Sequence, residues 1–196
     1  MERFELIIDE EMDIKGVQAI SLVSDPAIEA DFIALNKQKK IELAVVNDEK
    51  RILMGAALIP NKPIYRREGD VEFEVFFTND TVRKASELFF KQGNQSETTL
   101  EHLIDLSGNT VVESWIKEDE VHDKSVKFGV EAPVGSWIIS MKIEDDELYK
   151  MAKDGMIKGF SIEGYFVDNM LKAKKQSKED ELYNEIVDLI KNVTNK

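Results

Sequence analysis

Hydrophobic and polar residues alternate with the period of a half-buried strand along much of the chain. The clearest alternation runs over residues 71–77 and predicts a strand there. Residues 52–59 form a nearly continuous apolar run, which is typical of a strand buried on both faces or closed into a barrel. Pro60 and Pro63 end this run because proline has no N–H for a strand ladder. Further strands are predicted at residues 4–8, 19–23, 40–46, 98–106, 110–116, 134–143 and 156–167.

Three segments have the apolar spacing of helices. In residues 81–91, after the capping residues Asn79 and Asp80, Val82, Ala85, Leu88 and Phe89 share one face. Residues 147–154 begin with acidic side chains, end with lysines and stop at Gly155, as the helix dipole favours. The last segment has an apolar stripe from Leu182 to Val193 and follows a basic connector at 169–178. We therefore predict one domain over residues 1–168, and a linker with an amphipathic helix over 169–196.

The order of these elements favours a mainly β, α+β fold. The strands do not alternate with helices as βαβ units do, so we predict an antiparallel β-barrel or curled sheet with flanking helices. Residues 98–106 and 110–116 are predicted to pair as a hairpin, because Ser107-Gly108-Asn109 between them is a typical turn.

Composition narrows the function classes. The 196 residues carry a formal charge of −13, which argues against a dedicated nucleic-acid binder. The chain has no cysteine, which excludes disulfides, thiolate metal sites and a cysteine nucleophile. No apolar stretch approaches the ~20 residues of a membrane span, and the acidic N-terminus does not resemble a signal peptide. These features predict a soluble cytoplasmic protein without membrane contact.

Ser161 is the first candidate for chemistry. It lies in Lys158-Gly159-Phe160-Ser161-Ile162-Glu163-Gly164-Tyr165-Phe166, where the glycines would allow a substrate backbone to approach closely. The segment is not the G-x-S-x-G nucleophile elbow, because its second glycine comes three residues after the serine. On this segment alone, the ordinary interpretation of a serine in a bulged strand is favoured over a nucleophile.

The two histidines differ in their surroundings. His102 lies in a predicted strand, where a histidine is usually structural. If the predicted hairpin turns near Ser107, His102 faces Glu113 or Ser114, and directly opposed Cβ atoms lie ~4.5–5.5 Å apart. A carboxylate at that distance could orient an imidazole, although a one-residue register shift would move Glu113 to the other face. His122 lies in a charged loop without calcium-loop spacing and is interpreted as a surface residue.

Several segments taken together resemble a known family. These are Gly16 to Glu29, Ala57-Leu58-Ile59-Pro60 with Ile64-Tyr65-Arg66, Val112-Glu113-Ser114-Trp115-Ile116, Pro133-Val134-Gly135-Ser136-Trp137 and residues 158–166. In this order and spacing, from about Phe4 to Phe166, the chain resembles the phage prohead (capsid-maturation) serine proteases, in particular the XkdF-like phage serine proteases.

The resemblance implies a fold and a mechanism. The fold would be a closed, mostly antiparallel β-barrel wrapped by helices, like that of the herpesvirus assemblins. Ser161 would be the nucleophile and His102 the base. Related proteases use an acid or a second histidine as the third member, and the hairpin argument selects Glu113. No metal or cofactor is required.

The resemblance also implies a biological role. The chain would be a serine endopeptidase that cuts phage scaffold and capsid proteins, and itself, during prohead maturation. It would act in the host bacterial cytoplasm inside assembling proheads, with retention in the virion and a homodimer as further implications. The alternatives are a non-catalytic assembly protein (scaffold, core or portal-associated) on a degenerate protease fold, and an unrelated β-barrel binding module.

Overall fold

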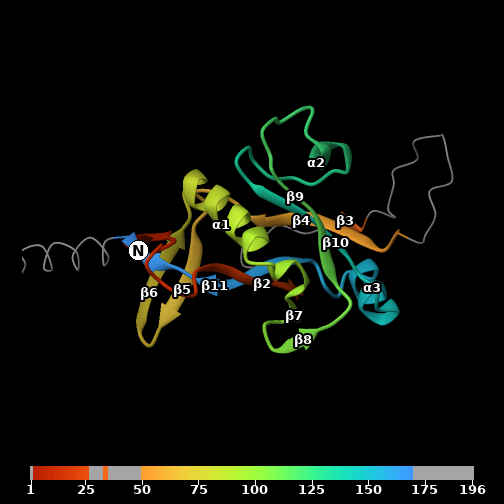
Figure 1. The fold of residues 1–196 in the computed structure, drawn as a ribbon, viewed down its shortest axis with the longest axis horizontal. Helices are drawn as coiled ribbons and strands as arrows, with labels where there is room; N and C mark the ends of the chain where they lie inside the picture. The colour runs from red at the N-terminus through yellow and green to blue at the C-terminus, as the bar shows by residue number, and fades with distance from the viewer. Residues whose placement is uncertain (1, 27–32, 35–49, 170–196) are drawn as a thin grey trace, which may run out of the picture.

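The computed structural model describes residues 2–26, 33–34 and 50–169 (Figure 1). The strands are β1 (Glu2–Ile7), β2 (Gly16–Val23), β3 (Ile33–Ala34), β4 (Ile52–Leu58), β5 (Ile64–Glu68), β6 (Val71–Phe76), β7 (Thr98–Leu100), β8 (Ile104–Leu106), β9 (Thr110–Ile116), β10 (Trp137–Lys142), β11 (Gly159–Tyr165) and β12 (Val167–Asp168). The helices are α1 (Asn79–Lys91), α2 (Lys124–Lys127) and α3 (Asp146–Lys153), with a 3₁₀ turn, η2 (Asn94–Ser96).

The strands form three four-stranded sheets. Their orders are β12-β1-β6-β5, β3-β4-β10-β9 and β11-β2-β7-β8. Most pairs are antiparallel, but β1 pairs with β6 and β2 pairs with β7 in parallel. The mainly β, α+β prediction is confirmed. The closed barrel is wrong for the described residues, because each sheet ends in strands that pair on one side only.

The local predictions from hydrophobic pattern agree well with the elements. Strands appear at or close to the predicted places from residue 2 to residue 168, although the segment predicted at 98–106 is split into β7 and β8. The strand predicted at 40–46 and the C-terminal helix lie outside the described residues, as does the connector apart from Asn169. No helix in the described residues is long and apolar enough to span a membrane.

Helix α1 packs against β2 and also contacts β9 and β10 (Figure 1). Its predicted apolar face is confirmed, since Val82, Ala85 and Phe89 are fully buried. The ring of Phe89 packs edge-on against Trp137 of β10, with centroids 5.4 Å apart. The cap is Thr78, whose side chain accepts a hydrogen bond from the Thr81 N–H, rather than the predicted Asn79 or Asp80.

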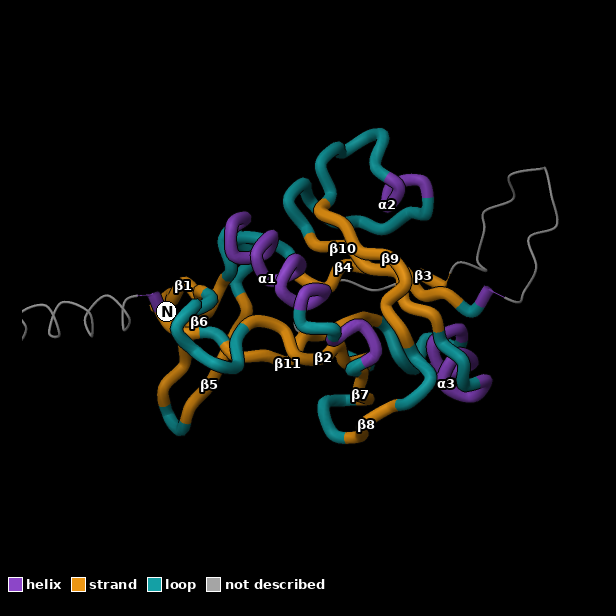
Figure 2. The backbone as a smooth tube through the Cα atoms, in the orientation of Figure 1, coloured by secondary structure: helices purple, strands orange, loops and turns teal. Residues whose placement is uncertain are grey.

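The predicted hairpin between residues 98–106 and 110–116 is wrong. Strand β8 turns back on β7, whereas β9 joins a different sheet and pairs with β10. The long loop that carries α2 connects β9 to β10 (Figure 2). The physical reason is that β9 forms six residue pairs with the buried β10, while β8 is a three-residue, mostly exposed strand.

Candidate active site

Ser161 lies on a face of the sheet that also carries two other hydroxyl side chains. Across the antiparallel pair of β11 and β2, Ser161 is directly opposite Ser21. Across the parallel pair of β2 and β7, Ser21 is opposite Thr99. Opposed residues point to the same face, so the three hydroxyls form a row across three strands. Ser21 is fully buried, and Ser161 is 8% exposed.

His102 reaches this row from the tight turn between β7 and β8. Glu101 and His102 have φ values of 52° and 58°, in the left-handed region that costs a non-glycine residue about 1–2 kcal/mol. The turn is held against β2: Glu101 N–H donates to the Leu22 carbonyl at 3.0 Å, and His102 N–H donates to Ser21 Oγ at 3.0 Å. Buried partners on β2 therefore fix the backbone that carries the imidazole.

Glu163 is the carboxylate that contacts His102. It follows Ser161 by two residues on β11 and therefore points to the same face of the sheet. Its Oε1 lies 3.1 Å from Nδ1 of His102 and also accepts a hydrogen bond from the Thr99 hydroxyl. A carboxylate beside Nδ1 keeps the proton on that nitrogen, which leaves Nε2 free to accept a proton.

The sheet face that bears Ser161 thus also carries Glu163, the carboxylate in contact with His102. Positions 161 and 163 are separated by roughly 7 Å along β11, and the imidazole is held at Glu163. Among the described residues, no side-chain hydrogen bond joins Ser161 Oγ directly to the imidazole. Such bonds are often long in unliganded enzymes and shorten when substrate binds.

The structure places Glu113 away from His102. Glu113 accepts hydrogen bonds from Lys124 Nζ, at 2.5 and 2.6 Å, and from the Ser140 hydroxyl, at 2.7 Å, on the neighbouring strand β10. Burial by itself would raise the pKa of Glu113, but the bonds from Lys124 and Ser140 lower it overall. The premise that put Glu113 opposite His102 was the wrong hairpin, so this carboxylate belongs to a structural cluster on the β3-β4-β10-β9 sheet.

His122 lies at the surface. Its side chain is 83% exposed and its Nδ1 lies 3.3 Å from Asp119 Oδ1, within the same loop. Backbone hydrogen bonds from His122 and Val121 are the main reason that the pKa of Asp119 is lowered. Over residues 2–26, 33–34 and 50–169, no group of three or more His, Asp or Glu side chains is placed to hold a metal ion.

The sequence alone did not predict that Glu163, Ser21 and Thr99 belong to the site. A signal for Glu163 was present, because a two-residue separation on a strand puts it on the same face as Ser161. No local pattern linked Ser21 or Thr99 to Ser161, because β2 pairs with β11, and β7 with β2, only across long distances in the sequence. Gly164 has a packing role: a Cβ there would lie 2.3 Å from the carbonyl oxygen of Gly16.

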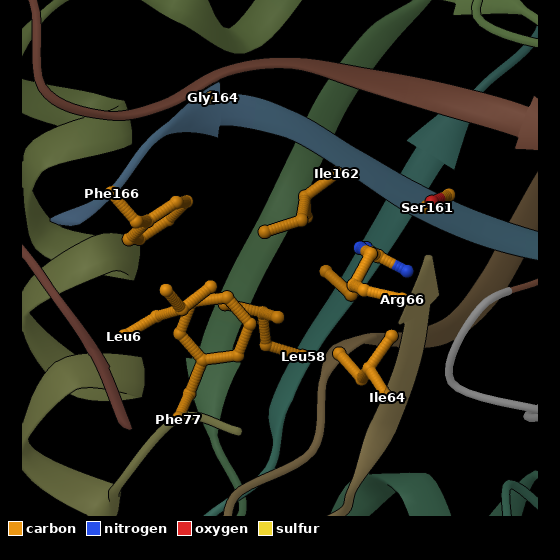
Figure 3. A pocket seen from close by; sticks show the side chains of 10 residues that line it. Leu6, Leu58, Ile64, Arg66, Phe77, Ser161, Ile162, Gly164 and Phe166 are labelled. Atoms are coloured by element: carbon orange, nitrogen blue, oxygen red, sulfur yellow. The ribbon is translucent and has the colours of Figure 1, made fainter. Parts of the chain in front are cut away.

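A cavity of about 220 Å³ opens beside Ser161, on the side of β11 away from β2 (Figure 3). Most of the side chains that line it are apolar, and they come from β1, β4, β5 and β11 and from the residues that follow β6 and β11. Its polar side chains are Ser161 and Arg66. The volume is smaller than the ~300–1,000 Å³ of sites for drug-sized ligands. The cavity therefore suits amino-acid side chains.

Comparison with known proteins gives one result. A protein-family model described as "Putative phage serine protease XkdF" matches residues 40–168. This span includes β4 to β12 and the candidate residues His102, Glu113, Ser161 and Glu163. No curated protein and no solved structure matches the chain.

Proposed function

The chain belongs to this family of phage serine proteases, and from that premise we propose that it is a serine endopeptidase with Ser161 as nucleophile, His102 as general base and Glu163 as the group that orients His102. The observation that carries the proposal is the contact of Glu163 with Nδ1 of His102, on the sheet face that also bears Ser161. A carboxylate beside Nδ1 is the acid–imidazole half of a catalytic triad, and the approach of Ser161 Oγ to Nε2 is part of the proposal.

The steps follow from these roles. Nε2 of His102 takes the proton from Ser161 Oγ as the oxygen attacks the carbonyl carbon of the scissile peptide bond. The tetrahedral intermediate collapses when the protonated imidazole gives its proton to the leaving amine, so the C–N bond breaks and an acyl-serine remains. Water, deprotonated by His102, then attacks the ester carbonyl; the C–Oγ bond breaks, the imidazolium returns its proton to Ser161 Oγ, and the carboxylate product leaves. Glu163 stabilises the imidazolium in both halves of the reaction.

The proposed substrates are the scaffold and capsid proteins of the same phage, and the chain itself, cut inside assembling proheads. This part of the proposal is supported by membership of a phage protease family. A homodimer and retention in the virion are parts of the same proposal. The second candidate is a non-catalytic assembly protein on the same fold, which the missing direct bond between Ser161 and His102 favours.

Co-expression with the phage capsid and scaffold proteins decides between the two candidates. Intact-mass spectrometry would compare the native chain with Ser161→Ala and with Ser107→Ala, whose serine is exposed in the loop between β8 and β9 and is not one of the three hydroxyls in the row with Ser161. We expect defined fragments with the native chain and Ser107→Ala, and none with Ser161→Ala. Identical intact masses in all three, with capsids still assembling, would overturn the protease proposal in favour of the assembly protein.

A further inference from the structure

Arg66 differs from the other arginines of the chain. The sequence has five arginines, and Arg3, Arg51, Arg67 and Arg83 each lie within 4 Å of a carboxylate. Among the described residues, Arg66 has no such carboxylate; its recorded hydrogen bond donates from Nη1 to the backbone carbonyl of Tyr65 at 3.0 Å. An arginine stays charged in a protein, so in the part of the chain that the structure describes this guanidinium has no counter-charge.

The guanidinium of Arg66 points toward β11 at the cavity beside Ser161 (Figure 3). The residue as a whole is exposed, but its surroundings remove enough water from the guanidinium to lower the pKa of Arg66. A partly desolvated cation attracts an anion more strongly than one in bulk water. The cavity therefore offers a bound ligand a positive group that no described side chain neutralises.

The remaining walls suit an aliphatic side chain. Leu58 and Ile64, which line the cavity, are almost fully buried. The other apolar side chains of its lining are Leu6, Ala57, Phe77, Ile162 and Phe166. Strand β11 has no partner on this side among the described residues. A peptide extended along a free strand edge directs alternate side chains toward the neighbouring surface. A side chain next to the bond at Ser161 would thereby enter the cavity.

We propose that this cavity binds an acidic side chain of the substrate, glutamate or aspartate, next to the scissile bond, with Arg66 pairing with its carboxylate. The apolar walls contact the methylene stem, which favours glutamate over aspartate. The inference rests on the proposed protease function and names its substrate class: peptide segments with an acidic residue at the cleaved bond. Arg66 is then the residue that determines specificity.

The test uses pairs of peptides that differ only by glutamate or glutamine at the position next to the cleaved bond. Cleavage by the full native chain would be compared with Arg66→Gln, Arg66→Glu and the control Arg67→Gln, which alters the neighbouring arginine that pairs with Asp70. A charge-assisted hydrogen bond corresponds to about a tenfold to hundredfold preference. We expect that preference in the native chain and Arg67→Gln, its loss in Arg66→Gln, and a preference for glutamine in Arg66→Glu, where two carboxylates would repel each other.

Binding to Ser161→Ala separates this inference from the proposed function. Fluorescence anisotropy with the same labelled peptides measures the preference for glutamate without any cleavage. If the native chain cuts nothing but Ser161→Ala still binds the glutamate peptide more tightly through Arg66, the protease proposal fails and the acidic pocket stands. If the native chain cuts both peptides of a pair equally well, the pocket inference is overturned and the protease stands.

A third result would also overturn the inference. If Arg66→Gln lowers kcat equally for both peptides, Arg66 stabilises the developing oxyanion instead of selecting a side chain.

Thermal unfolding of each variant tests whether the fold is intact. Arg66→Lys should restore part of the glutamate preference that Arg66→Gln loses, because lysine restores the positive charge.

Discussion

Replacing Glu163 by glutamine tests the proposed site most sharply, because it removes a negative charge and keeps the length of the side chain. In the native chain Glu163 Oε1 lies 3.1 Å from Nδ1 of His102. A carboxylate there holds the proton on Nδ1, whereas the amide of glutamine can donate to Nδ1 and move the proton to Nε2. His102 would then be a poorer base. We expect kcat to fall while KM changes little.

The magnitude depends on how far water reaches this pair. In a fully buried triad, exchanging the carboxylate for an amide costs about 10⁴-fold in kcat. Here the side chains of His102 and Glu163 are 41% and 32% exposed, so water screens their interaction. A single charge-assisted hydrogen bond contributes about 1.5–3 kcal/mol, which corresponds to a loss of about 10-fold to 150-fold in rate. We expect a loss in that range.

Peptide hydrolysis would give kcat and KM separately, and labelling of Ser161 by a fluorophosphonate would give the acylation rate. Glu113→Gln is the matched control, because it makes the same chemical change at the carboxylate that bonds Lys124 and Ser140. We expect this control to keep the native kcat. An unchanged kcat in Glu163→Gln, or a larger loss in Glu113→Gln, would refute the assignment of Glu163 to His102.

Two further predictions concern stability. Ser21→Ala leaves the backbone N–H of His102 without its acceptor. We expect the free energy of unfolding to fall by about 1–3 kcal/mol. An unchanged denaturation midpoint would contradict this expectation. The pKa of Glu113 in the folded chain lies below its ordinary value of 4.5. The ionised carboxylate therefore stabilises the fold above pH 4.5, and this stabilisation is lost as the pH falls through the pKa of the folded state. Denaturation of Glu113→Gln should therefore show a deficit at neutral pH that shrinks below pH 4.5, and a constant deficit would argue against it.

The local predictions succeeded where neighbouring residues carry the information. The period-two alternation of residues 71–77 gave β6, and the acidic start of the helix before Gly155 gave α3, which Asp145 caps by accepting the Leu148 N–H. In each case the side chains that decide the structure lie within a few positions of one another. Short-range patterns of burial and capping are readable from the chain without knowing its fold.

The error over Glu113 shows where this approach ends. A turn at residues 107–109 was a sound local inference, and Gly108 does adopt a positive φ of 80°. Yet the strand before it pairs with β7 and the strand after it pairs with β10. Which strands pair depends on the total area that each arrangement buries, and that quantity is not a property of any short segment.

The sequence by itself determined the strand-rich fold class, most element positions and the family resemblance, and it identified Ser161 and His102 as candidate catalytic residues. The tertiary structure alone decided that the three sheets of the described residues are not closed into a barrel, that Glu163 contacts His102, and that Arg66 lies at a cavity beside Ser161. The physical reason is the separation along the chain. Position 66 is distant from position 161 in sequence, and only the packing of β4 and β5 near the free edge of β11 brings their side chains to one cavity.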